Sequence, residues 1–255
     1  KRLELSAIPM AADTGPIGGN LSHEFIILAD TGESKIYTDK RIFDVEYSKT
    51  ILEKKSLENL RNEYDKFYAV TDDKFNKSEF EKKVETKNRL ITRGIEVGHI
   101  FYFGDKYSRP LNCHVNLQDG TKVAVKMGSY GIGVSRLVGA IIEANYINNV
   151  MKWPKLVSPF DVAIIPAIQK NDKNNLTKSL KIYDFLKKNK IDVILDDTDE
   201  NISAKFKKFD LLGIPYQIII GLKSKEDSFE FKEINGKTEM LNLELIKEKL
   251  LNKSK

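Results

Sequence analysis

The segment 127–144, MGSYGIGVSRLVGAIIEA, combines bare backbone with a cation at the start of an expected helix. Gly128, Gly131 and Gly133 lack side chains, so a flat ligand could lie directly on the chain there. Arg136 carries a guanidinium group, which can stack on a purine ring and pair with phosphate oxygens through two parallel hydrogen bonds. These residue types at this spacing favour a nucleotide site.

Two better-known nucleotide motifs do not fit the same letters. A phosphate-binding P-loop ends in Gly-Lys-Ser or Gly-Lys-Thr, and a dinucleotide fingerprint requires a third glycine where Arg136 stands. We therefore expect a strand ending at Gly128, a glycine-rich turn, and a helix that starts near Val134. One face of that helix is apolar and excludes Arg136; it consists of Val134, Leu137, Val138, Ile141 and Ile142. The alternative is that Arg136 pairs with a nearby carboxylate and that the glycines serve only the turn.

Two further strand-like segments, LSHEFIILAD and GIEVGHIFYFG, carry polar side chains among apolar ones. Side chains alternate along a strand, so Ser22 and Glu24 share one face while His23 and Phe25 share the other. A carboxylate such as Glu24 either binds a cation or forms a cross-strand ion pair. His114, in the segment NCHVNL, is interpreted as structural. The sequence lacks a cluster of cysteines and histidines, so it predicts no metal site.

Bulk composition sets the class of protein. The 255 residues carry 42 Lys+Arg against 37 Asp+Glu, a mild positive charge that is compatible with a polyanionic partner. A single cysteine, Cys113, excludes an internal disulfide and is typical of a reducing cytoplasm. The sequence shows neither an apolar run of membrane-spanning length nor a signal peptide. We expect a cytoplasmic protein without a membrane partner.

Composition changes along the chain divide it into zones. The zone of about 40–93 is rich in charge and lacks glycine and proline before its end, and its apolar residues recur at intervals of three and four. Two apolar stripes, Ile51, Leu52, Leu57 and Leu60 and then Phe75, Phe80 and Val84, predict a helical insertion with a solvated face. Strand patterns flank this insertion, and the sequence around Asp119-Gly120 predicts a hairpin.

The last zone follows the linker KWPKLVSPF and has a different pattern, in which strands alternate with helices. The strands DVAIIPAI, IDVILDD and YQIIIGL alternate with two helical segments, which indicates right-handed crossovers and a parallel sheet. A further strand, SFEFKEI, and a terminal helix, NLELIKEKLLNK, complete it. The chain therefore contains at least two domains, one antiparallel with an insertion and one small and α/β.

Four segments resemble, in order, the bacterial-type prolyl-tRNA synthetases among the class II aminoacyl-tRNA synthetases. They are ADTGPIGGNLSHEFIILA, GIEVGHIFYFGDKYS, GSYGIGVSR, which is similar to motif 3 of that class, and the pair DVAIIPA and LLGIPYQIIIG. The resemblance covers almost the whole chain apart from the charged insertion. It implies a partial antiparallel class II catalytic sheet of α+β type over 1–153, with the insertion at about 40–93, and an α/β anticodon-binding domain over 158–255.

The resemblance also implies a two-step ligase reaction. Proline attacks the α-phosphate of ATP, and the prolyl group is then transferred to proline tRNA. ATP, Mg²⁺, L-proline and proline tRNA are the expected cofactors and partners, with a homodimer in the full-length protein. Such catalysis depends on positioning and charge neutralisation at phosphorus, with no side-chain nucleophile.

Motif matching assigns roles to individual residues. The resemblance gives Arg136 the catalytic role at adenine and the γ-phosphate, and it places ATP on Gly128, Ser129, Gly131 and Gly133. The expected proline site consists of Ser22, Glu24, Glu96, His99 and Phe101. Here Glu24 would hold the prolyl ammonium, the ring of Phe101 would contact the pyrrolidine, and His99 would donate to a carbonyl oxygen. Lys205, Lys207 and Lys208 are the expected tRNA contacts, with an ordinary solvated helix as the alternative for each.

The sequence departs from the family's pattern in two respects. Motif 1, which forms the dimer, and motif 2, which supplies a second arginine, are missing from the match, so the chain is expected to be a C-terminal part that is inactive alone. The insertion is shorter than the editing domain of many relatives, so hydrolysis of mischarged alanyl-tRNA is expected to be absent. The alternatives are a non-catalytic tRNA-binding module derived from a class II synthetase, and a synthetase of another specificity, such as threonyl. The GGNLSHEF block and the missing zinc ligands count against the threonyl alternative.

Overall fold

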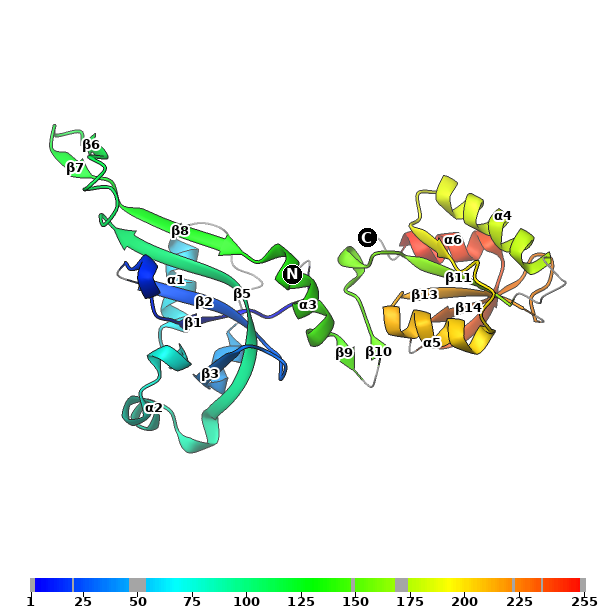
Figure 1. Cartoon of the computed structure of the whole chain (residues 1–255), viewed down its shortest axis with the longest axis horizontal. Coiled ribbons are helices and arrows are strands. Elements are labelled where there is room, and N and C mark those ends of the chain that lie inside the picture. The colour runs from blue at the N-terminus through cyan, green and yellow to red at the C-terminus, as the bar shows by residue number, and fades with distance from the viewer. Residues whose placement is uncertain are drawn as a thin grey trace. The chain divides into compact units, whose positions relative to one another are not determined.

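A computed structural model describes residues 3–19, 21–45, 54–147, 150–167, 174–221, 223–234 and 236–252. The chain divides into two compact units, Leu3–Ala144 and Asn145–Lys255 (Figure 1). Each unit has its own sheet and its own buried core, and each is described separately below. Among the described residues, no helix is both long and apolar enough to cross a membrane.

The first unit is built on a six-stranded sheet that is antiparallel except for one pairing. Its strands are β1 (Ile8–Ala11), β2 (Leu21–Leu28), β3 (Ser34–Asp39), β4 (Ala69–Thr71), β5 (Arg89–Gly104) and β8 (Met127–Ile132), in the order β2-β1-β4-β3-β5-β8. The pair β1–β4 is parallel. Because β2 also pairs with β5, the strands β2, β1, β4, β3 and β5 close into a ring of hydrogen-bonded neighbours. Strand β5 curves strongly along its length (Figure 1).

The charged segment is only partly helical. It contributes α1 (Lys54–Tyr64) and α2 (Lys77–Lys83), but also β4, which joins the main sheet, and the first residues of β5. Ile51 and Leu52 lie outside the described residues. The second apolar stripe does bury its side chains: Phe80 and Val84 pack with Tyr37, Tyr68 and Val70, and Phe75 lies against this cluster. The segment is therefore integrated into the first unit by a shared sheet and a shared core.

The glycine-rich segment forms a strand, so the expected turn after Gly128 is wrong. Residues Met127–Ile132 pair with β5, with Gly131 opposite His99 and Gly128 opposite Tyr102. A side chain at Gly128 would put its Cβ 3.0 Å from the carbonyl oxygen of Phe101, so bare backbone permits this close pairing. The helix that follows, α3 (Val134–Ala144), begins where the apolar pattern predicts.

A hairpin connects β5 to β8. Its strands are β6 (His114–Asn116) and β7 (Lys122–Ala124), and Gly120 has a φ of 82° in the turn between them. This confirms the hairpin predicted around Asp119-Gly120. Figure 1 shows it extending beyond the ends of β5 and β8.

The second unit is an α/β layer structure. The short strands β9 (Tyr146–Ile147) and β10 (Val150–Met151) pair with each other. The main sheet has the order β12-β11-β13-β14-β15, from strands β11 (Val162–Pro166), β12 (Val193–Leu195), β13 (Tyr216–Ile220), β14 (Phe229–Glu233) and β15 (Thr238–Leu241). The first three strands of this order are parallel and the remaining pairings are antiparallel, as the alternating pattern predicts for its parallel part.

Three helices cover this sheet: α4 (Asn174–Lys188), α5 (Ile202–Leu212) and α6 (Leu243–Asn252). Gly213 adopts a left-handed conformation with φ 71° and its N–H bonds to the carbonyl of Phe209, which ends α5. Apolar residues of the strands and of α4 and α6 form one core, while Phe209 of α5 lies in a second core with Ala163 and Ile165. The strands and helices predicted from the sequence are confirmed here, and β15 is an addition.

Candidate functional site

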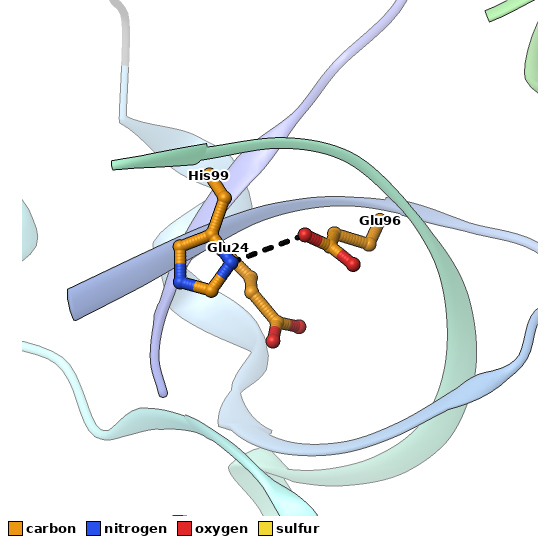
Figure 2. Close-up of side chains that lie close together, drawn as sticks. All are labelled: Glu24, Glu96 and His99. Carbon is orange, nitrogen blue, oxygen red and sulfur yellow. Dashed lines mark hydrogen bonds and ion pairs between the residues drawn. The ribbon is translucent and has the colours of Figure 1, made fainter. Parts of the chain in front are cut away.

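Three titratable side chains meet on two neighbouring strands of the first unit. Glu24 lies on β2, whereas Glu96 and His99 lie on β5, where His99 is the direct partner of Glu24 in the strand register. One polar atom from each residue lies within 4.8 Å of the others. Figure 2 shows the three side chains converging, with His99 Nδ1 3.2 Å from Glu96 Oε1. Antiparallel pairing of β2 with β5 thus brings Glu24 next to Glu96 and His99, which come much later in the sequence.

Ser22 and Phe101 complete this group through His99. The hydroxyl of Ser22 lies 2.5 Å from His99 Nε2, and Ser22 itself is buried. The rings of His99 and Phe101 stack with centroids 4.0 Å apart. Both nitrogens of the imidazole are therefore engaged and its plane is fixed by a neighbouring ring. The five residues of the expected proline site lie together in the structure.

The environment of Glu24 disfavours its charge. Burial and the neighbouring carboxylate of Glu96 raise the pKa of Glu24 to about 7, with further contributions from Asp73 and Glu33. Arg136 acts in the opposite direction. A cation bound between Glu24 and Glu96 would favour the ionised form of both carboxylates, so this pair is suited to hold a positively charged group.

The neighbouring residue His23 lies on the opposite side of β2. Burial lowers the pKa of His23, which favours the neutral imidazole. The register between β2 and β5 shifts between Phe25 and Ile26, immediately after the site residues. The simple alternation predicted for SHEF therefore holds for Ser22 and Glu24, and the irregularity begins beyond them.

Arg136, in the first turn of α3, contacts this group. Its Nη1 donates to the backbone oxygen of Glu96 at 3.0 Å and to Glu96 Oε2 at 3.2 Å, and it pairs with Glu33 Oε1 at 3.3 Å. The side chain remains half-exposed. The structure thus shows the arginine–carboxylate pairing given above as the alternative, and the same pairing places the guanidinium next to the Glu24–Glu96–His99 group. Glu33 was not predicted; it lies in the turn between β2 and β3, and its sequence context carries no signal for this contact.

The glycines beside Arg136 differ in the space around them. Within the described part of the chain, a Cβ on Gly131 would meet no atom within 4 Å, whereas a Cβ on Gly133 would lie 3.2 Å from the Cβ of Arg136. Gly131 therefore leaves open space next to His99, its partner across the strands. Ser129 lies opposite Phe101 and is exposed. The bare face of β8 at Gly131 can accept a flat group.

The chemistry of the group determines which cations it suits. Two carboxylates and an imidazole are a donor set typical of zinc and other transition metals, whereas Mg²⁺ prefers oxygen atoms and retains several waters. The same two carboxylates can hold an organic ammonium through charge-assisted hydrogen bonds. The oxygen donors beside Arg136, on Glu33 and Glu96, fit a hard cation that arrives with a phosphate ligand.

The lysines of α5 have three different environments. Lys205 is fully buried, and its Nζ contacts the carbonyl oxygens of Pro166 at 3.3 Å and Asp196 at 3.2 Å. Lys208 pairs with Asp196 at 3.0 Å and with Glu200 at 2.6 Å. Lys207 is exposed.

The expected tRNA contact by Lys205 is therefore wrong, because its ammonium lies inside the second unit. Position 205 precedes Phe209 by four residues, so both belong to the inward face of α5. Burial opposes ionisation of the partner Asp196, yet hydrogen bonds from Thr198 and Lys208 hold the pKa of Asp196 below its usual value. The helical spacing of Lys205 and Phe209 was the available signal for this burial.

The second unit matches a known domain family. The family described as an anticodon binding domain matches residues 161–253. The second unit therefore carries a domain of this family.

Comparison with whole proteins shows which enzymes the chain resembles along most of its length. Over 248 residues the chain is 63% identical to the proline–tRNA ligase of Pelagibacter ubique, covering 96% of this chain and 56% of that ligase. It is 47% identical to the enzyme of Bartonella quintana, covering 91% and 53%, and 45% identical to that of Parvibaculum lavamentivorans, covering 95% and 56%. The chain is thus homologous to the proline–tRNA ligases and spans about half the length of the curated relatives it matches.

Proposed function

We propose that this chain supplies part of a proline–tRNA ligase, which activates proline with ATP and transfers it to proline tRNA. The observation that carries the proposal is the meeting of Glu24, Glu96 and His99, on the adjacent strands β2 and β5, with Arg136 of helix α3. It joins a guanidinium, two carboxylates and open glycine backbone in one site. Its homologues are proline–tRNA ligases, which supports this choice of reaction.

In the proposed amino-acid subsite, the carboxylates of Glu24 and Glu96 hold the secondary ammonium of proline. The raised pKa of Glu24 means that this carboxyl is only partly ionised near neutral pH, and a bound cation would favour its charged form. The stacked rings of His99 and Phe101 offer a flat wall for the pyrrolidine ring. The hydroxyl of Ser22 contacts Nε2 of His99, so the imidazole ring keeps one orientation in this wall.

In the proposed nucleotide subsite, the adenine ring lies over Gly131 and the guanidinium of Arg136 contacts the ring and a phosphate. Binding of ATP would exchange the pairing of Arg136 with Glu33 and Glu96 for pairing with phosphate oxygens. Glu33, released from Arg136, would offer oxygen atoms to a Mg²⁺ ion that arrives with ATP, and this ion would neutralise phosphate charge. Ser129 and Gly128 remain proposed contacts of the same strand.

The reaction then needs orientation more than acid–base chemistry. A carboxylate oxygen of proline attacks the α-phosphorus of ATP, the bond to the bridging oxygen breaks, and pyrophosphate leaves with that electron pair. In the second step a terminal ribose hydroxyl of the tRNA attacks the prolyl carbonyl and AMP leaves. Arg136 and the ammonium-binding carboxylates hold the two reactants in place, which lowers the entropic part of the barrier. Because the chain spans about half the length of its relatives, we propose that activation requires the remaining part, where the dimer contacts and a second phosphate-binding arginine are expected.

The second unit is the proposed tRNA-binding part. Lys207 is exposed on α5 and is proposed to contact phosphate, whereas Lys208 already has its charge balanced by Asp196 and Glu200. A contact of this kind contributes affinity and salt dependence without reading the base sequence.

Proline-dependent exchange of pyrophosphate into ATP tests the proposal. The chain would be compared with a chimera that adds the part of the Pelagibacter ubique ligase not covered by the match. We expect exchange in the chimera and its loss, by at least about 100-fold, in the Arg136→Ala variant, since removing a phosphate-binding charge typically costs a few kcal/mol. Unchanged exchange in the variant would disprove the role of Arg136, and absence of exchange in both proteins would favour a non-catalytic tRNA-binding module.

A further inference from the structure

The charged insertion contacts the strand that supports the candidate amino-acid subsite. Strand β4 pairs with β1 at Val70 and Ala11, and the hydroxyl of Thr71 lies 3.3 Å from the carbonyl oxygen of Ala11. The short helix η3 (Asp72–Lys74) follows at once, and Asp73 Oδ2 accepts a hydrogen bond of 2.5 Å from the backbone N–H of Asp13. Thr71 also donates to the other carboxylate oxygen of Asp73.

The opposite edge of the same short segment contacts the site directly. The backbone N–H of Ala12 donates to the carbonyl oxygen of Ser22 at 3.2 Å, and Met10 lies opposite Glu24 in the β1–β2 register. Ala12, Thr71 and Ser22 are all buried. Residues 11–13 are therefore held between the insertion on one side and the strand of Ser22 and Glu24 on the other.

The contacting end of the insertion is itself anchored. Tyr37 donates to Asp72 Oδ1 at 2.9 Å, and its ring stacks on Phe75 with centroids 3.6 Å apart. These two contacts flank Asp73 in sequence and attach η3 to β3. A side chain held in this way can fix a neighbouring backbone, because its own conformational freedom is already lost.

Asp73 also acts on the site through its charge. Its carboxylate is among the groups that raise the pKa of Glu24, after burial and Glu96. Substitution of Asp73 is therefore expected to change both the position of the subsite strand and the ionisation of Glu24, and an asparagine at this position separates the two effects.

We propose that Thr71 and Asp73 are positioning residues of the amino-acid subsite, through which the insertion sets the place of Ser22 and Glu24. The inference rests on the proposed function for the identity of the ligand, but the contacts between the insertion and residues 11–13 can be tested without it. In this arrangement the insertion has a structural effect on proline binding although it contributes no residue to the subsite.

The first experiment measures hydrogen exchange in the whole chain. Asp73→Ala and Thr71→Val are expected to accelerate exchange at the amides of Ala12 and Asp13, which donate to Ser22 and Asp73, and to leave the amides of the second unit unchanged. Thr71→Ser should restore protection because it keeps the hydroxyl. Glu63→Ala is the matched control, since it removes a carboxylate of the same insertion that pairs only with Lys66 among the described ion pairs. Unchanged exchange at Ala12 and Asp13 in both variants would overturn the proposal.

The second experiment measures the KM values of the chimeric ligase. Asp73→Ala is expected to raise the KM for proline about 5-fold, the equivalent of one hydrogen bond, and to leave the KM for ATP unchanged. Asp73→Asn keeps one acceptor oxygen for Asp13 and should recover most of the affinity. Equal changes in both KM values, or none, would contradict a positioning role at this subsite. If the unsubstituted chimera lacks exchange activity, the proposed function fails, and the hydrogen-exchange result still decides whether the insertion holds residues 11–13.

Discussion

At the scale of single residues, Glu24 shows how the fold changes the ionisation of a partly buried carboxyl group. Its carboxyl group is partly withdrawn from water and lies near Glu96, so the pKa of Glu24 rises to about 7. Arg136 pairs with Glu96, whereas none of the ion pairs among the described residues involves Glu24. The site thus has one carboxylate balanced by an arginine and another whose charge depends on what is bound, a division of roles that suits a substrate with a positive nitrogen.

The raised pKa of Glu24 predicts a pH dependence of stability. Between its ordinary pKa of 4.5 and about 7, folded Glu24 holds a proton that the unfolded chain has released, so raising the pH through this window destabilises the fold. Glu24→Gln cannot ionise. The stability of the natural protein relative to this variant is therefore expected to fall across the window.

Hydrogen exchange at the amides of β2 and β5 measures this difference at several pH values. Exposed Glu248, on α6, supplies the control substitution Glu248→Gln, which should run parallel to the natural protein. A constant difference between the Glu24→Gln variant and the natural protein would show that Glu24 ionises normally in the fold.

At the scale of elements, the glycines of β5 and β8 have opposite reasons for being glycine. A Cβ on Gly94 would lie 2.2 Å from Ile26 Cγ2 and 2.7 Å from the carbonyl oxygen of Ile27, so β2 and β5 can approach only if the side chain is missing. At Gly131 the same atom would meet open space. One glycine therefore serves packing, and the other leaves room above an edge strand.

These two glycines give a matched prediction. Gly94→Ala should lower the free energy of unfolding of the first unit by about 2 kcal/mol or more, because backbone and a buried side chain must shift. Gly131→Ala should change it by less than about 0.5 kcal/mol but raise the KM of the chimera for ATP, since its methyl group stands where adenine is proposed to lie. Urea denaturation measures the change in the free energy of unfolding, and the kinetics of pyrophosphate exchange measure the KM of the chimera for ATP. A large loss of stability in Gly131→Ala, or an unchanged KM for ATP, would contradict this assignment.

The sequence predicted those elements whose pattern is local. The alternation of the second unit, the hairpin at Asp119-Gly120 and the start of α3 follow from periodicity and turn residues, and the structure confirms them. The conversion of the expected glycine turn into β8 could not be foreseen, because an edge strand is defined by its partner β5, which is distant in sequence. The same holds for β4, whose three residues carry too short a pattern to distinguish strand from helix.

The residues of the candidate site were likewise predicted only in part. Glu24, Glu96 and His99 were selected by a family resemblance, and only the strand register shows that they meet. Glu33 was missed because its contact with Arg136 depends on tertiary structure. Lys205 was misplaced because a lysine is ordinarily exposed, and its burial depends on the carbonyl groups and the carboxylate of Asp196 around it.

At the scale of the whole molecule, the chain distributes its proposed tasks over two compact units. The cluster of Glu24, Glu96 and His99 lies in the first unit together with Arg136, and the anticodon-binding domain lies in the second. In the proposed ligase this division would let recognition of the tRNA change without altering the reacting groups.

The division predicts that two substitutions have separate effects. Lys207→Ala should weaken binding of the chimera to proline tRNA and reduce the salt dependence of that binding by about one unit in the log–log slope, with pyrophosphate exchange unchanged. Arg136→Ala should abolish exchange and leave tRNA affinity intact. Filter binding at several salt concentrations, with Lys249→Ala on α6 as the control, measures the first effect. Equal loss of tRNA affinity in the control would make the contribution of Lys207 a general charge effect.

The long strand β5 has a practical consequence for changing the chain's length. Its 16 residues pair with β3, β2 and β8, and it carries Glu96, His99 and Phe101 on the way. Deleting one residue within it would turn every later side chain to the other face and take the site apart in a single event. The exposed hairpin tip at Asp119 and Gly120 tolerates growth far better, because β6 and β7 form a sheet of their own. A tag or reporter peptide is best inserted at that tip, because added length there leaves the pairing register of β2, β5 and β8 unchanged.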